Sequence, residues 1–261
     1  MSETRDDATL HRIHAAGWPL PGTLWERLSP AERAFAEHEL CGLRTVAYYR
    51  RRIAALGFLG FDTVLDLGCG IGQWSCVLAE GNRRVTGVDP NGSRLAMART
   101  LAGAMGLDNC AHAAARAETL PLPDGSVDAV FCYGVFMFTE MPGCLREAHR
   151  VLRSGGRIYL NANSWGWYAH LLIDRGIRRG DWGMARTALA MTTRAFSGAS
   201  TQMLVRRDWL HGQVRAAGLR ILASGQEGDV VLDSAVEPPE PAYPRRFYGL
   251  PAILELVAEK A

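Results

Sequence analysis

Residues 64–74 read VLDLGCGIGQW, an apolar run followed by three glycines at alternate positions. The apolar run is typical of a buried strand. The glycines predict a tight turn that brings the backbone close to a ligand. A helix that begins after such a turn directs free N–H groups into it. The stretch therefore predicts a strand, a ligand-binding turn and a helix in direct succession.

A second predicted strand, residues 84–89, ends in Asp89. An acid at the end of the neighbouring strand can accept hydrogen bonds from the two hydroxyls of a ribose. The glycine turn and this acid together predict a cofactor that contains a nucleoside.

The kind of cofactor follows from what the turn lacks and from Asp66. A dinucleotide fingerprint needs glycine at its sixth position, which here is Gln73 counted from Gly68 and Ser75 counted from Gly70. No Gly-Lys-Ser/Thr follows, which excludes a P-loop. The Asp66 carboxylate would repel a pyrophosphate and suits an ammonium group. A donor with a ribose, no phosphate and a cationic amino-acid end fits best, which is S-adenosylmethionine.

Three blocks of sequence resemble the signature of class I S-adenosylmethionine-dependent methyltransferases of the small-molecule type. They are residues 66–72 with Asp89, residues 117–128 and residues 146–157, and they occur in the order of the family. The resemblance implies an α/β fold with a Rossmann-like, doubly wound, mostly parallel sheet. It also implies a reaction without a metal, because the sulfonium donor is already activated.

The 261 residues suffice for one large domain with appendages. We expect an N-terminal helical cap over residues 1–60 that covers the cofactor. A cofactor-binding core over residues 61–235 follows, with a helical insertion at residues 164–205. A proline-rich extension, residues 236–261, is expected to finish in a short helix at 251–260. Strands are expected at residues 63–67, 84–89, 111–115, 127–132, 157–161, 219–223 and 230–232.

The net charge of +2 predicts no general attraction to nucleic acid or to a membrane. The six cysteines show no C-x-x-C spacing, which argues against a metal site and for reduced thiols in a cytoplasmic protein. The polar N-terminus does not resemble a signal peptide, and no apolar stretch is long enough to span a bilayer. The expected partner is a small-molecule acceptor. The sequence leaves open whether the protein forms a homodimer.

The resemblance implies cofactor contacts at the ends of the predicted strands. Asp66 and the turn would hold the methionine end, Asp89 the ribose, and Pro90 would lie against the adenine. Many relatives carry an acid where this chain has Arg116, so the backbone of Ala117 is expected to replace that contact. The full set is Asp66, Gly68, Cys69, Gly70, Asp89, Pro90, Ala117, Glu118, Cys132 and Tyr133.

Cys132 and Tyr133, after the fourth predicted strand, are expected to face the methionine amino group and the donor methyl. Relatives often carry a histidine shortly after this strand, where this chain has FMFTE at residues 136–140. A general base is needed if the nucleophile is a hydroxyl. His170 is favoured because it lies in the aromatic insertion, and His211 is predicted to be structural. The catalytic candidates are His170, Tyr133 and Glu140, with Asp174 and His211 as further potential bases.

The aromatic insertion predicts a ring-bearing or sugar-like acceptor of the natural-product type, methylated at oxygen or nitrogen. Arginines between residues 175 and 179 could bind a carboxylate or phosphate on it, or form a solvated helix face. A nucleic-acid methyltransferase is an alternative, which would need a basic face and aromatic stacking platforms. A cofactor-binding protein that does not methylate is another, because the fold does not fix the function.

Overall fold

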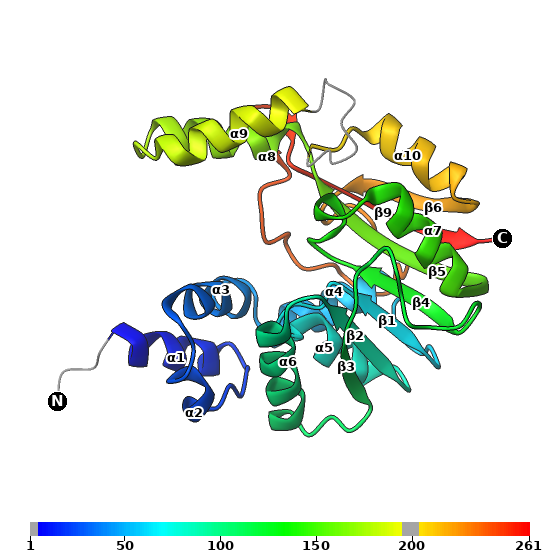
Figure 1. The fold of residues 1–261 in the computed structure, drawn as a ribbon, viewed down its shortest axis with the longest axis horizontal. Helices are drawn as coiled ribbons and strands as arrows, with labels where there is room; N and C mark the ends of the chain where they lie inside the picture. Colours follow the sequence, from blue (N-terminus) through cyan, green and yellow to red (C-terminus); the bar gives the residue numbers. More distant parts are fainter. Residues whose placement is uncertain (1–4, 195–203) are drawn as a thin grey trace. The chain divides into compact units, whose positions relative to one another are not determined.

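The computed structural model describes residues 5–194 and 204–261 (Figure 1). The chain forms two compact units, one of Met1–Arg116 with Asp233–Ala242 and one of Ala117–Leu232 with Tyr243–Ala261. None of the helices in the described ranges is long and apolar enough to cross a membrane. The predicted division at residues 60 and 235 stays a prediction.

The first unit begins with helices, as the sequence predicts, and local capping explains where they start. The Ser29 side chain accepts a hydrogen bond from the Glu32 N–H, and the Glu32 carboxylate accepts one from the Ser29 N–H, so a capping box starts the third helix at Pro30. Thr45 caps the fourth helix with one hydrogen bond, which its hydroxyl accepts from the Tyr48 N–H. These helices are α1 (Arg5–Ala15), α2 (Gly22–Trp25), α3 (Pro30–Leu40) and α4 (Val46–Ala55).

The first unit also contains parallel strands in the order β3-β2-β1. Val64 pairs with Val85, and Val85 pairs with Cys110. Strands β1 and β2 are largely buried, which is typical of a parallel sheet, whereas the only buried residue of β3 is His112. The predicted strands and helices are confirmed as β1 (Val64–Leu67), α5 (Gln73–Gly81), β2 (Val85–Asp89), α6 (Gly92–Ala104) and β3 (Cys110–Ala114).

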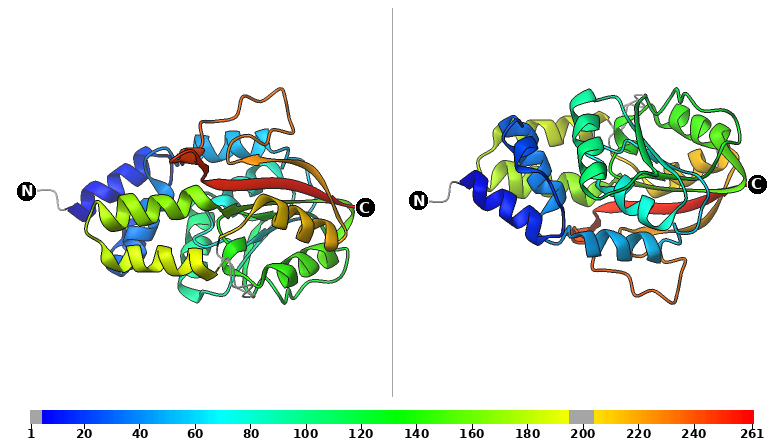
Figure 2. Two further views of the ribbon diagram at one scale, coloured as in Figure 1. Left: turned by 90° about the horizontal axis from the view of Figure 1, so that it is seen from above. Right: turned by 90° about the horizontal axis from the view of Figure 1, so that it is seen from below.

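The second unit continues the α/β pattern with strands in the order β4-β5-β9-β6. Strand β4 is parallel to β5, and β9 is antiparallel to both β5 and β6 (Figure 2). The predicted α/β class with a mostly parallel sheet is confirmed. The elements in this layer are β4 (Val127–Cys132), α7 (Met141–Val151), β5 (Leu152–Asn163), α10 (Arg207–Ala216), β6 (Leu219–Gln226) and β9 (Ile253–Lys260).

Two predictions near the C-terminus are wrong. Residues 251–260 do not form a helix, because Ile253–Lys260 is a strand that bonds to neighbours on both sides. Its first six residues are all buried, and an apolar run buried on both faces has no period that separates strand from helix. Residues 230–232 form no strand, because β9 occupies the position beside β6.

The insertion after β5 is helical, as predicted, and belongs to the second unit. It consists of α8 (Trp165–His170), a π-helical segment η2 (Leu171–Ile177) and α9 (Trp182–Arg194). A hairpin of β7 (Arg246–Phe247) and β8 (Leu250–Pro251) packs on α8. Residues 195–203 of the predicted insertion lie outside the described residues.

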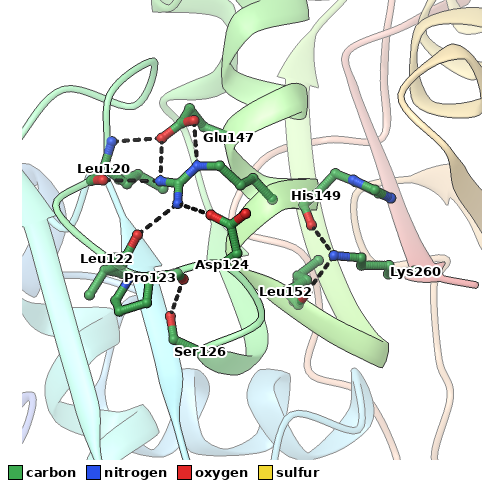
Figure 3. Close-up of polar contacts among 10 residues, drawn as sticks. Leu120, Leu122, Pro123, Asp124, Ser126, Glu147, His149, Leu152 and Lys260 are labelled. Atoms are coloured by element: carbon green, nitrogen blue, oxygen red, sulfur yellow. Dashed lines mark hydrogen bonds and ion pairs between the residues drawn. The ribbon is translucent and has the colours of Figure 1, made fainter.

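Arg150 of α7 fixes the loop between β3 and β4. Figure 3 shows Leu120, Leu122, Asp124 and Glu147 gathered around one guanidinium. Its guanidinium binds Glu147 and Asp124 and also donates to the carbonyls of Leu120 and Leu122. The hydrogen bonds that Arg150 donates raise its pKa, the one to Glu147 most and the one to Asp124 next. This network therefore fixes the chain that leads from the Ala117–Glu118 turn to β4.

Candidate functional site

The glycine turn has a backbone conformation that other residues rarely adopt. Gly68, Gly70 and Gly72 have φ angles of +76°, +55° and +83°. A Cβ on Gly72 would lie 2.7 Å from the Cβ of Ala98, so α6 packs directly on this residue. A Cβ on Gly70 would meet only the Phe35 ring of α3, at 4.0 Å. The turn is therefore closed on the α6 side, whereas a Cβ at Gly70 would reach the Phe35 ring at van der Waals distance without a clash.

Gln73 begins α5 directly after the turn and is only 6% exposed. Its side-chain nitrogen donates to Glu39 of α3 at 2.9 Å. Its side-chain oxygen is buried without a hydrogen-bond partner among the described residues. A buried unpaired carbonyl costs about 1–3 kcal/mol. A ligand that brings a hydrogen-bond donor to the turn would satisfy this oxygen.

Asp66 lies inside the first unit at the end of β1 and is 2% exposed. Its carboxylate accepts a hydrogen bond of 2.5 Å from the Ser75 hydroxyl of α5. Burial raises the pKa of Asp66 to about 7, and the Ser75 bond and nearby His112 oppose that increase. A cationic ligand nearby would favour its ionised form. The predicted role of Asp66 stays a prediction.

Asp89 ends β2 and is buried beside the turn. One carboxylate oxygen accepts from the Gly70 N–H at 3.1 Å and the other from the Asn91 N–H at 2.8 Å. Each oxygen has a second lone pair, so both can also accept from a diol. Pro90 is exposed next to this carboxylate. The predicted contact of its ring with the adenine stays a prediction.

In the second unit, Ala117 and Glu118 form a turn and are both half-buried. Glu118 accepts a hydrogen bond of 2.8 Å from the Glu140 backbone. Glu140 caps α7, and its side chain accepts from the Gly143 N–H at 2.6 Å. This capping bond gives Glu140 a structural function at the start of the helix. Its predicted catalytic role, and the predicted roles of Ala117 and Glu118, stay predictions.

Cys132 ends β4 and is fully buried, while the next residue, Tyr133, is half-buried. The Tyr133 hydroxyl donates a hydrogen bond to the carboxylate of Glu227. Glu227 follows β6 and is 2% exposed. The sequence gives Glu227 no role beyond a turn, so the partner of Tyr133 was missed.

His170 and Asp174, two of the candidate bases, lie together in the insertion. The His170 Nδ1 atom is 2.8 Å from an Asp174 carboxylate oxygen, and the imidazole stacks on Phe247 with ring centres 4.3 Å apart. Asp174 also accepts from the Tyr248 hydroxyl at 2.6 Å and from Arg178 at 2.8 Å. The bonds from Tyr248 and then His170 lower the pKa of Asp174. This arrangement holds the imidazole between Asp174 and the Phe247 ring, and the catalytic role predicted for His170 stays a prediction.

The other candidates from the sequence lie elsewhere. His211 is half-buried on α10, where burial, followed by the charge of Arg215, lowers its pKa. Arg178 pairs with Asp174, whereas Arg175 and Arg179 are exposed. The roles predicted for these residues stay predictions. Among the described residues, no group of three histidine, cysteine or acidic side chains is arranged to hold a metal ion.

Comparison with known proteins gives a family for the core. Residues 65–160 match the model of a family described as a methyltransferase domain. The ubiquinone/menaquinone biosynthesis C-methyltransferase of Rubrivivax gelatinosus is 38% identical over 95 residues, which is 36% of each chain. An uncharacterized methyltransferase of Bacillus subtilis is 31% identical over 130 residues, 49% of this chain and 48% of its own length. The chain thus spans about a third to a half of the length of these curated relatives.

Solved structures resemble the chain over a longer span. Geranyl diphosphate methyltransferase in complex with S-adenosylmethionine has a TM-score of 0.59 at 19% identity, covering 95% of this chain and 94% of that one. The cyclase SpnF has a TM-score of 0.57 at 19% identity, covering 82% and 81%. At these identities the likeness shows the shared fold.

Proposed function

Because residues 65–160 form a class I S-adenosylmethionine-dependent methyltransferase domain, we propose that the protein transfers a methyl group to an oxygen or nitrogen of a ring-bearing small molecule. S-adenosylmethionine is the cofactor of this domain. When bound, it supplies an electrophilic methyl carbon on a sulfonium.

Contacts within the first unit fit this cofactor. Asp89 has lone pairs for a ribose diol, and Gln73 has a buried acceptor with no partner among the described residues. Both flank the glycine turn, where the Phe35 ring lies next to Gly70. The ammonium and ribose hydroxyls of the cofactor are hydrogen-bond donors, so they match these acceptors.

The observation that supports a ring-bearing acceptor is the aromatic cluster around His170 in the second unit. Trp167 lies edge-on to Tyr243 at 4.9 Å, and His170 stacks on Phe247. Aromatic side chains bind flat apolar rings through large contact areas. The polar pair of His170 and Asp174 in the same cluster would orient a hydroxyl or amine on such a ring.

The test is incubation with labelled S-adenosylmethionine and a panel of phenols, arylamines and geranyl diphosphate, followed by mass analysis of labelled products. We expect label on oxygen or nitrogen of a ring-bearing member and equal formation of S-adenosylhomocysteine. Cofactor binding without any S-adenosylhomocysteine would instead favour a protein that does not methylate. Label transferred to RNA, with binding that weakens steeply in salt, would favour the nucleic-acid alternative.

Methylation at carbon is the second candidate, and the names of the relatives favour it. The relative from Rubrivivax gelatinosus is named a C-methyltransferase, and one structural neighbour is a geranyl diphosphate methyltransferase. Fragmentation of the labelled product in the mass spectrometer separates this outcome from methylation at oxygen or nitrogen.

A further inference from the structure

We propose that Tyr133 and Glu227 act together as the proton acceptor of the reaction when the acceptor molecule is methylated at a hydroxyl. The inference rests on the proposed function and assigns a step that methylation at a hydroxyl requires. Glu227 is the new residue in this assignment.

The sheet brings these two residues to one edge. Strand β6 is antiparallel to β9, which is antiparallel to β5, and β5 is parallel to β4. Strands β4 and β6 therefore run in the same direction. Tyr133 directly follows the last residue of β4, and Glu227 directly follows the last residue of β6, so both lie at the carboxyl ends of their strands. Ligands of doubly wound folds bind at this edge. The hydrogen bond between Tyr133 and Glu227 joins the two strand ends there.

The turn that carries Glu227 is held rigidly by Glu255 of β9. One Glu255 oxygen accepts from the N–H groups of Gly228 at 3.1 Å and Val230 at 2.8 Å, and the other accepts from the Tyr159 hydroxyl at 3.1 Å. The Glu227 N–H also donates to the Ile253 carbonyl at 3.0 Å. The Glu255 carboxylate accepts hydrogen bonds from three donors, so its function is to stabilise the turn. Glu227, in contrast, accepts a hydrogen bond from a hydroxyl that can both give and take a proton.

The proposed step relays a proton from the acceptor hydroxyl to Glu227 through the Tyr133 hydroxyl. As the acceptor oxygen uses a lone pair to bond to the methyl carbon, the carbon–sulfur bond breaks and its electron pair stays on sulfur. The proton of the acceptor hydroxyl passes to the Tyr133 oxygen, and the Tyr133 proton passes to Glu227. Tyr133 is unchanged after this exchange, Glu227 is neutral, and its proton leaves to solvent when the product departs.

Burial separates this pair from His170, the base favoured from the sequence. Glu227 is 2% exposed, whereas the side chain of His170 is 22% exposed. A proton acceptor that excludes water protects the electrophilic methyl group from hydrolysis. His170 then fixes the acceptor ring through its stacked imidazole, and Glu227 takes the proton.

The experiment measures single-turnover methyl transfer to a phenol of the panel against pH, and the affinity for S-adenosylhomocysteine by calorimetry. Glu227→Gln keeps a hydrogen-bond acceptor for Tyr133 but cannot take a proton, and Tyr133→Phe removes the link. Glu259→Gln is the matched control, because Glu259 pairs with Arg220 at the surface of β9. His170→Ala tests the competing base.

We expect Glu227→Gln and Tyr133→Phe each to slow transfer by about 10²-fold or more and to lose the rise in rate with pH. Glu227→Gln and the control Glu259→Gln should keep the wild-type affinity for S-adenosylhomocysteine. Formate should partly restore Glu227→Ala. Wild-type rate and pH dependence in Glu227→Gln, or loss of the pH dependence only in His170→Ala, would overturn the proposal. Failure of wild type to methylate any panel member shows that the proposed function fails, and the inference with it.

Discussion

Replacing Asp66 by asparagine should remove a pH dependence of stability that comes from one buried carboxyl group. Asp66 is 2% exposed and accepts its hydrogen bond from a neutral hydroxyl, Ser75. Burial raises its pKa from 3.8 to about 7. Between these values the folded protein holds a proton that the unfolded chain has released, so stability falls as the pH rises.

The size of this effect follows from the two pKa values. A difference of about 3 units corresponds to a cost of about 4 kcal/mol once the carboxylate is ionised in both states, above about pH 7. At about pH 5 the cost is roughly 1.7 kcal/mol, so about 2–3 kcal/mol is lost between about pH 5 and pH 8. The asparagine side chain does not titrate and can still accept from Ser75.

Urea unfolding of wild type and Asp66→Asn at these two pH values measures the effect. The wild-type protein should lose about 2–3 kcal/mol more than the variant, which is a shift of roughly 1 M in the urea midpoint. Asp62→Asn is the matched control, because Asp62 is an acid of the same unit that is 62% exposed. It should retain the wild-type pH dependence. Parallel stability curves for wild type and Asp66→Asn would refute the reasoning.

Three further substitutions test the turn and the acceptor cluster. Gly72→Ala should lower the free energy of unfolding by about 2–4 kcal/mol, measured in urea, because its φ of +83° and the Ala98 contact at 2.7 Å both oppose a side chain. Phe35→Ala should weaken S-adenosylhomocysteine binding about tenfold in calorimetry, because the Phe35 ring lies against Gly70. The control Leu43→Ala, at an exposed position of the same unit, should bind as wild type does. Equal affinities of Phe35→Ala and wild type would contradict the assignment. His170→Ala should raise KM for the acceptor about tenfold while the rise in rate with pH remains, because its imidazole stacks on Phe247; an unchanged KM would remove His170 from the acceptor site.

The elements around the glycine turn could be predicted because their signals are local. Glycine at positions 68, 70 and 72 is required by positive φ angles within five residues of chain. The acid of β2 is recognisable by its place at the end of an apolar strand. The hydrogen bond from the Gly70 N–H to Asp89 confirms that turn and acid lie together. Each of these features depends on short-range geometry that sequence patterns encode directly.

The acceptor cluster could be predicted only in part. His170 and Asp174 lie four residues apart, so a helix places them on one face. Phe247 and Tyr248 belong to a hairpin that lies more than seventy residues after His170 and Asp174 in the sequence. The sequence of a short turn with a glycine does not indicate which helix the hairpin packs against. Tyr248 has a φ of +53°, which composition does not indicate for a tyrosine.

The misassignment of residues 253–260 explains why Glu227 was missed. Interpreted as a helix, this segment leaves β6 without a neighbour that fixes its direction. As strand β9, antiparallel to both β5 and β6, it requires β6 to run parallel to β4. The residue after β6 then lies at the same edge as the residue after β4, where ligands of this fold bind. The position of Glu227 beside Tyr133 therefore depends on the direction of one strand, β9, at the C-terminus of the chain.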